Sequence, residues 1–498
     1  MSSPLFYAAE GDRPRPIVAA ALLATFMQAV NISLPNAAVL YIQGALSMSD
    51  DEIGWVFSAY IAASAMMMPM TGWLAGKIGR KRLIMISLAT FSAALILDTL
   101  ATTPLQFVFA RILQGAASGP VAPLAMGMLL EETSPKQHKR MSTAWAVASL
   151  LGMLSGPGIG GWLSEFHGWR SIFYFSLPLC GFILLAMGLW LHEKKPDRAP
   201  PFDFFGLAAF TTGIAGLQML LDRGERLEWF ASTEIRIEAI ASLCGFYLYI
   251  VHALTRHTHF LHKALWSHRN FGLAAVMHFV LGFVLLPTLA LTSPMLEELL
   301  GYPADTAGFI TLPRGIALIA AVIFTWQVPS WIDNRLFIAG GMALVVWGTW
   351  RMLGYSPLMD SWPVAAAGVL QGTGLGILMP ALTRAAFGTL DLKLHPEGTI
   401  LFNLSRLYGS TIGIAVVQDF FYGNTQAMHL ALASHLKAYA ASSHAVGTLS
   451  APTLAMVNEM VTGQAAMIAV IDQFKLLMIA MLCVSPLILF LRRPQPSL

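Results

Sequence analysis

Charged residues are scarce in this sequence. Asp, Glu, Lys and Arg make up only 11% of its 498 residues, whereas 56% are apolar. Soluble domains carry about 25% charged residues, so this composition excludes a water-soluble globular enzyme, a disordered chain and a nucleic-acid-binding protein. The net charge of +3 is also small. The chain is therefore expected to lie in a lipid bilayer.

Cysteine is nearly absent, and no catalytic motif is present. Cys180, Cys244 and Cys483 lie far apart inside apolar runs, which favours buried small side chains over a disulfide or a metal site. The sequence has no HExxH, no GxSxG and no phosphate-binding glycine loop. An enzyme and the direct use of ATP are thus poorly supported, and neither a cofactor nor a metal is expected. The N-terminal residues lack the apolar core of a cleavable signal peptide.

Long apolar runs recur through the chain instead. A bilayer core about 30 Å thick needs about 20 apolar residues in a helix, and these runs are too long, and alternate too little, for barrel strands. The sequence predicts an all-α membrane protein with fourteen spans, the first of them interrupted by Pro35. The spans are expected near residues 17–40, 53–75, 83–101, 106–130, 141–163, 170–192, 204–221, 236–255, 271–293, 305–328, 336–354, 362–384, 399–422 and 473–491.

Basic residues are distributed unevenly between the connections. Of the 30 Lys and Arg, 19 lie at the termini and in one set of alternating connections, and five lie in the other set. Because cytoplasmic loops are enriched in Lys and Arg, both termini are expected in the cytoplasm, which requires an even number of spans. The weakly charged connection 425–470 would then lie outside the cytoplasm, as a plain connector, a lid or a partner-docking element. Its segments 425–440 and 451–470 are candidate interfacial helices.

A glycine-rich, basic motif follows the second span and comprises Gly72, Gly76, Gly79 and Arg80. Gly72 and Gly76 are expected to let two helices approach closely, and Gly79 is expected to permit a tight turn. The basic residues suit contact with the anionic inner leaflet. The alternative is a positively charged cytoplasmic loop without a further role.

The next two spans carry further unusual residues. Arg111, followed by Gln114, lies inside the fourth span, where an arginine is costly unless it faces a cavity or a partner. It is either functional or tied to backbone carbonyls between helices. Glycine and proline in the fifth span weaken that helix, which favours close packing at a bending point rather than a mere kink. These residues are Gly156, Pro157, Gly160 and Gly161.

In this order and spacing, the three motifs resemble those of the major facilitator superfamily over nearly the whole chain. The fourteen spans resemble its drug:proton antiporter branch, and segments 221–230 and 403–409 resemble EmrB-type exporters. The resemblance implies two six-helix bundles, 1–198 and 261–498, that rock around a central cavity, with two helices inserted in 199–260.

The resemblance also implies a function. It implies a proton-coupled exporter of hydrophobic or amphipathic drugs or toxic compounds, which works by alternating access in the bacterial inner membrane. Its energy source would be the proton gradient. Its partners would be a periplasmic adaptor of the EmrA type and an outer-membrane channel of the TolC type.

The sequence departs from the family pattern at two acids. Asn31 stands where the family commonly has Asp in helix 1, and an amide cannot titrate. Gly76 likewise stands where the family usually has Asp. Asp98, inside the third span, is therefore the first candidate for the proton-coupling acid. The other candidate acids are Asp222, Glu225 and Asp419, and the other residues expected on the substrate or proton pathway are Asn36, Arg111, Gln114, Arg314, Asn403 and Arg406.

Other functions stay open at this point. Arg111, Arg314 and Arg406 would either bind carbonyls or attract an anionic group of the substrate, while His278 is expected to serve helix packing. The alternatives are a dedicated exporter of one metabolite or fatty acid with altered coupling, and a non-transporting membrane sensor. The short loops leave no room for an output domain, which disfavours the sensor.

Overall fold

The structure is a computed structural model, and all the regular structure that it describes is helical. The all-α class predicted from the sequence is therefore confirmed. The chain divides into two compact units, one of Met1–Ser47 with Ala59–Pro200 and the other of Met48–Ser58 with Pro201–Leu498. The described residues are 15–134, 137–193, 202–224, 227–255, 264–328, 332–390, 394–443 and 451–492.

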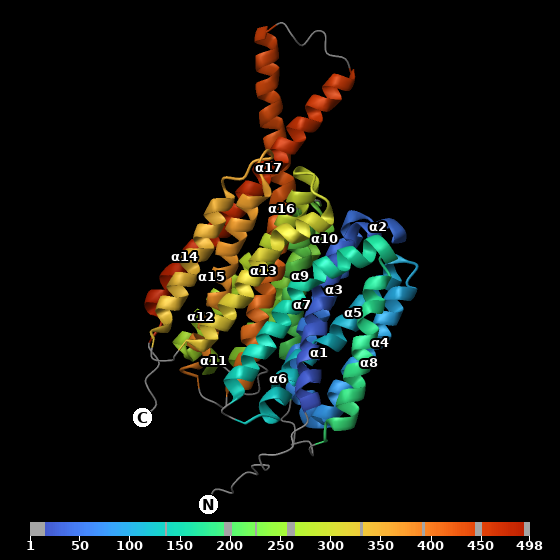
Figure 1. Ribbon diagram of the computed structural model, residues 1–498, viewed down its shortest axis with the longest axis vertical. Helices are drawn as coiled ribbons and strands as arrows, with labels where there is room; N and C mark the ends of the chain where they lie inside the picture. The colour runs from blue at the N-terminus through green and yellow to red at the C-terminus, as the bar shows by residue number, and fades with distance from the viewer. Residues whose placement is uncertain are drawn as a thin grey trace, which may run out of the picture. The chain divides into compact units, whose positions relative to one another are not determined.

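The helices up to α8 make up most of the first unit (Figure 1). The first span breaks at a 3-10 turn, Leu34–Ala38, because Pro35 lacks the backbone N–H that an α-helix needs. The predicted fourth span also breaks, at Gly119–Pro120, into two helices. The helices are α1 (Arg15–Ser33), α2 (Val39–Leu46), α3 (Asp50–Ile78, which crosses the unit boundary), α4 (Arg80–Leu100), α5 (Pro104–Ser118), α6 (Val121–Glu131), α7 (His138–His167) and α8 (Ser171–Trp190).

The second unit holds the remaining helices, with α9 and α10 grouped among them. A π-helical turn, Met295–Leu299, extends α12, and 3-10 turns at Trp229–Ala231 and Ser485–Phe490 precede α10 and follow α17. The helices are α9 (Phe204–Arg223), α10 (Thr233–Thr255), α11 (Ala264–Ser267), α12 (Arg269–Pro294), α13 (Ala304–Gln327), α14 (Asn334–Met352), α15 (Ser361–Phe387), α16 (His395–Ser443) and α17 (Ala451–Val484).

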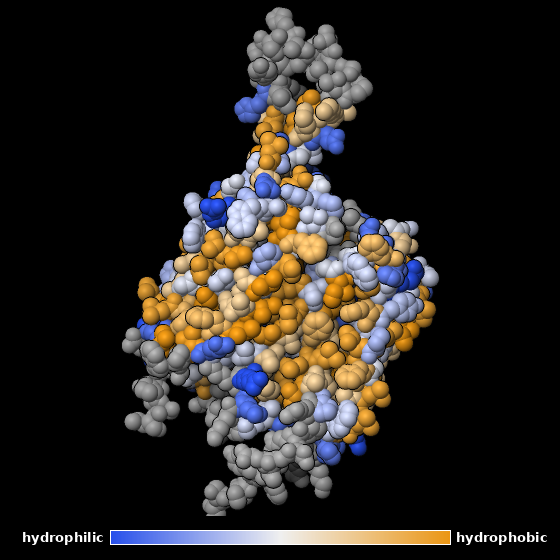
Figure 2. Space-filling view, viewed as in Figure 1, coloured by the Kyte–Doolittle hydropathy of each residue, from blue (hydrophilic) through white to orange (hydrophobic). Residues whose placement is uncertain are grey.

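Each predicted span coincides with helical structure. Among the described residues, 11 helices are long and apolar enough to cross a membrane, and α3, α14 and α16 lie on the other three predicted spans. Figure 2 shows apolar side chains along the helices and hydrophilic ones toward their ends. Cys180 is buried as expected, but Cys244 and Cys483 are exposed. Burial was wrongly predicted for these two, because an apolar run can face lipid as well as protein.

The connection 425–470 is helical at 425–440 and 451–470, the two segments for which the sequence suggested helices, but these segments continue the neighbouring spans and do not form a separate loop. α16 continues to Ser443 and α17 begins at Ala451, and the two run on together beyond the ends of α14 and α15 (Figure 1). Asn424 Nδ2 donates to Asp472 Oδ2 at 2.8 Å, and His429 Nε2 lies 3.1 Å from Asn458 Oδ1. These side-chain contacts join the two helices, so the segment is a helical hairpin.

Helix pairing is the same in the two units. In the first, α1 packs on α7 and α8, and α4 packs on α5 and α8. In the second, α12 packs on α16 and α17, and α14 packs on α15 and α17. The two units are thus built on one plan.

Candidate functional site

A chain of buried polar side chains crosses the first unit. Asn31 Nδ2 on α1 donates to Ser176 Oγ on α8 at 2.9 Å, and also to the carbonyl of Met27 at 2.9 Å. Gln114 Nε2 on α5 donates to Asn31 Oδ1 at 3.3 Å. Asn31, Gln114 and Ser176 are at most 2% exposed. The structure therefore brings together Asn31 and Gln114, two of the residues predicted from the sequence, and adds Ser176, which sequence reasoning missed.

Arg111 extends this chain toward α3 and α4. Its Nη1 donates to Gln114 Oε1, and its guanidinium carbon lies 4.6 Å from the centre of the Tyr60 ring. It also interacts electrostatically with Asp98 on α4. The arginine is 1% exposed, and its partners include the side chain of Gln114 and the ring of Tyr60.

Asp98 stands apart from this network in one respect. The residue is fully buried, and neither of its carboxylate oxygens has a hydrogen-bond partner among the described residues. An ionised carboxylate in such surroundings is costly unless a charge or a proton compensates it. Arg111 acts on Asp98 electrostatically as an opposite charge, without a direct hydrogen bond between the two side chains.

The glycines of the predicted motifs differ in their packing. A Cβ atom at Gly160 would overlap the carbonyl oxygen of Leu34, and one at Gly156 would overlap Ser33, so α7 packs closely on α1 as expected. The helix α7 continues through Pro157 and Gly161 to His167. Gly72 is exposed and has nothing among the described residues within 4 Å of the Cβ position, so no close helix approach is seen at Gly72 within the first unit.

The turn after α3 agrees with the prediction. Gly79 has a φ of 92°, which favours glycine, whereas Gly76 lies inside α3. The basic residues after the turn find partners within the first unit: Arg80 pairs with Glu131, and Lys81 Nζ donates to the carbonyl of Gly188 at 2.8 Å. These contacts tie the start of α4 to the ends of α6 and α8.

The second unit contains a related polar cluster. Gln371 Nε2 on α15 donates to Thr288 Oγ1 at 3.2 Å and to Thr349 Oγ1 at 3.0 Å. Arg314 on α13 donates from Nη2 to the carbonyl of Leu285 at 3.1 Å, while its Nε and Nη1 have no hydrogen-bond partner among the described residues. Arg314 also interacts electrostatically with Tyr355. Gln371 and Tyr355 were missed from the sequence.

A repeated motif could have revealed the relation between the two clusters. Leu-Gln-Gly-x-x-x-Gly occurs at residues 113–119 and again at 370–376. A Cβ at Gly115 or Gly119 would overlap the carbonyls of Tyr60 or Ser64, one turn apart on α3; a Cβ at Gly372 or Gly376 would overlap those of Arg314 or Leu318, one turn apart on α13. Tyr60 and Arg314 therefore occupy equivalent positions. By the same alignment, Arg111 is equivalent to Gly368. The first unit therefore has its arginine on α5 and the second has its arginine on α13, the helix that corresponds to α3.

Two further candidates, Asn403 and Arg406, make contacts outside these two clusters. Asn403 Nδ2 donates to the carbonyl of Thr399, one turn back in its own helix, at 3.0 Å. His278 Nδ1 lies 2.8 Å from the carbonyl of Phe402, and the two rings stack with centres 3.9 Å apart, which confirms a packing role. Arg406 interacts electrostatically with His278. Asp419 lies in α16, Glu225 lies outside the described residues, and the side chains of Asn36 and Asp222 are likewise not described.

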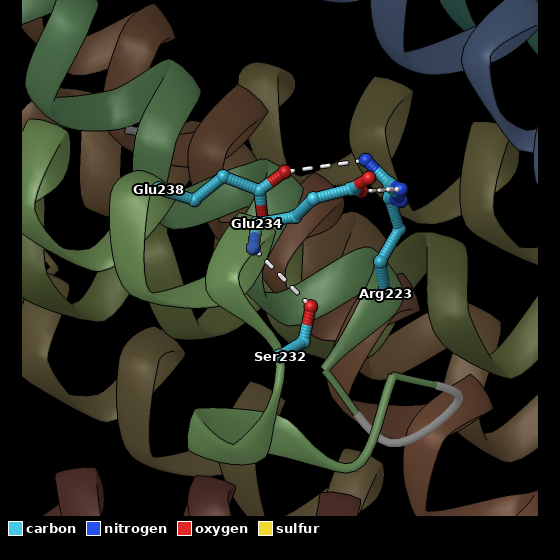
Figure 3. A network of polar contacts seen from close by, with 4 residues as sticks. All are labelled: Arg223, Ser232, Glu234 and Glu238. Carbon is cyan, nitrogen blue, oxygen red and sulfur yellow. Dashed lines mark hydrogen bonds and ion pairs between the residues drawn. The ribbon is translucent and has the colours of Figure 1, made fainter.

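A cluster of charged side chains holds the connection between α9 and α10 (Figure 3). Arg223 Nη2 lies 2.5 Å from Glu234 Oε2, and its Nη1 lies 3.3 Å from Glu238 Oε1. Ser232 Oγ accepts from the backbone N–H of Glu234 at 3.2 Å, at the start of α10. Arg223 belongs to segment 221–230, which was compared with EmrB-type exporters, and its side chain fastens α9 to α10.

Comparison with known proteins decides the family. The family model described as Major Facilitator Superfamily matches residues 21–414. The chain belongs to the Major Facilitator Superfamily. It is thus a multi-pass membrane transporter and not an enzyme, as the sequence predicted. The human organic anion transporter MFSD10 (TETRAN) shares this fold, with a TM-score of 0.55 and 14% identity over 95% of this chain and 100% of the other.

Its relatives within the superfamily are EmrB-type exporters. The chain is 30% identical to the fatty acid resistance protein FarB of Neisseria gonorrhoeae, over 89% of each chain. It is 27% identical to the multidrug export protein EmrB of Haemophilus influenzae, over 84% of this chain and 82% of that protein. With EmrB of Escherichia coli it shares 27% identity over 82% and 80% of the two chains. The EmrB-type resemblance found in the sequence is confirmed.

Proposed function

We propose that this transporter exports hydrophobic and amphipathic compounds in exchange for protons. The names of the relatives, multidrug export and fatty acid resistance proteins, support the substrate class. The observation that carries proton coupling is Asp98, a fully buried acid whose oxygens have no hydrogen-bond partner among the described residues. A titratable group inside the membrane is what a proton-driven transporter needs.

The neighbours of Asp98 suit both protonation states. When Asp98 is ionised, Arg111 supplies the opposite charge; when Asp98 is protonated, Arg111 keeps Gln114 and the Tyr60 ring as partners. Gln114 passes the connection on to Asn31. A proton bound at Asp98 would thereby change the interactions of several helices at once, which is the kind of two-state element that alternating access requires.

In this proposal an amide at position 31 does not abolish proton coupling, because Asp98 is the group that takes the proton. Its amide donates and accepts at the same time, to Ser176 and from Gln114, which an ionised carboxylate cannot do. Asn31 thus maintains the polar chain while Asp98 takes the proton. The position where the family resemblance implies an acid becomes a neutral link.

The hairpin of α16 and α17 suits a partner outside the membrane. A helix of 49 residues is about 74 Å long, well beyond a bilayer core of about 30 Å. We infer that a periplasmic adaptor of the EmrA type binds this hairpin, and that an outer-membrane channel of the TolC type completes the pump. The transporter then lies in the bacterial inner membrane with both termini in the cytoplasm, and a fluorescent protein that folds only in the cytoplasm should fluoresce at either end.

Transport in proteoliposomes with an imposed pH gradient tests the proposal. Wild type should move both dodecanoate and a neutral hydrophobic dye, and only with the gradient. Asp98→Asn should still bind both compounds but lose gradient-driven transport. The matched control is Asp360→Asn, an exposed acid that caps α15, where Asn caps equally well. Full transport without a gradient refutes coupling, and transport of dodecanoate alone favours the dedicated exporter.

Removal of residues 430–456 tests the hairpin. The shortened protein should transport normally in proteoliposomes but should no longer protect cells, because the adaptor is lost. Unchanged resistance in cells would show that the adaptor does not need the hairpin.

A further inference from the structure

The two buried arginines differ in their counter-charge. Arg111 has Asp98 as an electrostatic partner, whereas Arg314, 6% exposed, has no carboxylate partner among the described residues. Its one hydrogen bond goes to the carbonyl of Leu285. A buried guanidinium without an opposite charge is strongly unfavourable. In the first unit the equivalent residue is Tyr60, so the close helix contact itself does not require an arginine. The presence of Arg314 therefore needs another explanation.

Other polar atoms beside Arg314 are also unused. Tyr355 Oη and Gln371 Oε1 are buried and have no hydrogen-bond partner among the described residues. Tyr355 interacts electrostatically with Arg314, and Gln371 precedes Gly372, whose Cβ position overlaps the Arg314 carbonyl. Two guanidinium nitrogens from α13, an amide from α15 and a phenol from the turn after α14 thus lie in one buried region, all with unused hydrogen-bonding capacity.

We propose that Arg314, with Tyr355 and Gln371, binds the carboxylate of an amphipathic anionic substrate. The planar guanidinium donates to a carboxylate through two nitrogens, and the Tyr355 hydroxyl is a third donor. The Gln371 amide group, once rotated, donates a fourth hydrogen bond in place of those to Thr288 and Thr349. Burial strengthens the attraction because water screens it little.

Glycine makes the room for this site. A Cβ at Gly368 would lie 3.2 Å from Arg314 Cβ, so a side chain at this position, which is equivalent to Arg111, would crowd Arg314. The second unit therefore has its arginine on α13 and a glycine, Gly368, at the facing position of α15. Because Arg314 is nearly closed off here, the anion enters in a more open state of the transport cycle.

This inference rests on the proposed export function for its substrate, but it is tested by binding alone. The name of the 30% identical relative, fatty acid resistance protein, makes dodecanoate a suitable probe, with dodecanol as the uncharged analogue of equal chain length. Wild-type protein in detergent should bind dodecanoate about tenfold or more tightly than dodecanol, the effect of one or two charge-assisted hydrogen bonds. Equal affinities for the two probes would overturn the proposal without use of any variant.

Variants then assign the preference to the site. Arg314→Gln should bind the two probes within about twofold of each other, whereas Arg314→Lys should restore part of the preference and Tyr355→Phe should weaken dodecanoate binding alone. The control is Arg236→Gln, an exposed arginine on α10 that bonds within its own segment, which should keep the wild-type preference. A preference that persists in Arg314→Gln, with a wild-type size-exclusion profile, refutes the site. Transport without any carboxylate preference would refute the site and leave the proposed export function intact.

Discussion

Two glycines on α14 offer a matched test of how closely the helices of the second unit pack. A Cβ at Gly348 would lie 2.7 Å from the backbone N of Gln371 and 3.0 Å from the carbonyl oxygen of Ala367 on α15, whereas a Cβ at Gly340 meets nothing within 4 Å. Both glycines lie inside the same helix. Alanine at either position therefore gains the same helix propensity, and only Gly348→Ala adds an overlap.

The magnitude follows from these distances. Ordinary Cβ contacts begin at 3.4 Å, so α14 and α15 must separate by several tenths of an ångström in Gly348→Ala. Overpacking of this kind costs about 1–3 kcal/mol, while replacing a helical glycine by alanine contributes up to about 1 kcal/mol of stability. The propensity gain cancels in the comparison, and Gly348→Ala should be less stable than Gly340→Ala by about 1–3 kcal/mol.

Thermal unfolding in one detergent, followed by size-exclusion chromatography, measures this difference. Gly340→Ala should unfold at or above the wild-type temperature, and Gly348→Ala below it. Because the added Cβ overlaps the backbone N of Gln371 and must displace this residue, dodecanoate binding should also weaken in Gly348→Ala alone. An unfolding temperature for Gly348→Ala equal to or above that of Gly340→Ala would refute the close packing described for α14 and α15.

Further predictions concern the polar clusters. Gln114→Leu removes the partner of both Arg111 and Asn31 and should cost about 2–3 kcal/mol. The control is Gln106→Leu, an exposed residue of the same helix whose side chain accepts from Thr102 at the helix start; it should cost about 1 kcal/mol, and similar losses would contradict the network. Arg223→Gln breaks two ion pairs between α9 and α10 and should lower the unfolding temperature by the equivalent of about 1 kcal/mol. Arg236→Gln, an exposed arginine bonded within its own segment, should change it little, and equal effects would argue against the cluster.

Much of the fold was predictable, because hydropathy and length act locally. Each span needs only its own apolar residues, so the helices were found one at a time. The break at Pro35 and the turn at Gly79 were also local, since one residue determines each. The hairpin of α16 and α17 was missed as such, because Ala-rich, weakly charged helices outside lipid give no strong hydropathy signal and were taken for a loop with possible helical segments.

The site was predictable only in part, for a physical reason. A polar residue in an apolar run is visible in the sequence, which identified Asn31, Asp98, Arg111 and Arg314 as candidates. Their partners depend on which helix faces touch, and Ser176 is 145 residues from Asn31. No close approach is seen at Gly72 within the first unit, since glycine permits a close approach but does not require one.

The repeated Leu-Gln-Gly motif explains why each unit carries an arginine and why their surroundings differ. The shared glycines are required on both sides, because the helix backbones lie too close for a side chain. The arginine is held from α5 in one unit and from α13 in the other, and among the residues that the structure describes only Arg111 has an acid, Asp98, as an electrostatic partner. A guanidinium with its own acid suits exchange of a proton, whereas one without an acid suits an anion brought from outside. The first unit would thus bind the proton and the second the substrate, so one structural plan serves both sides of the exchange.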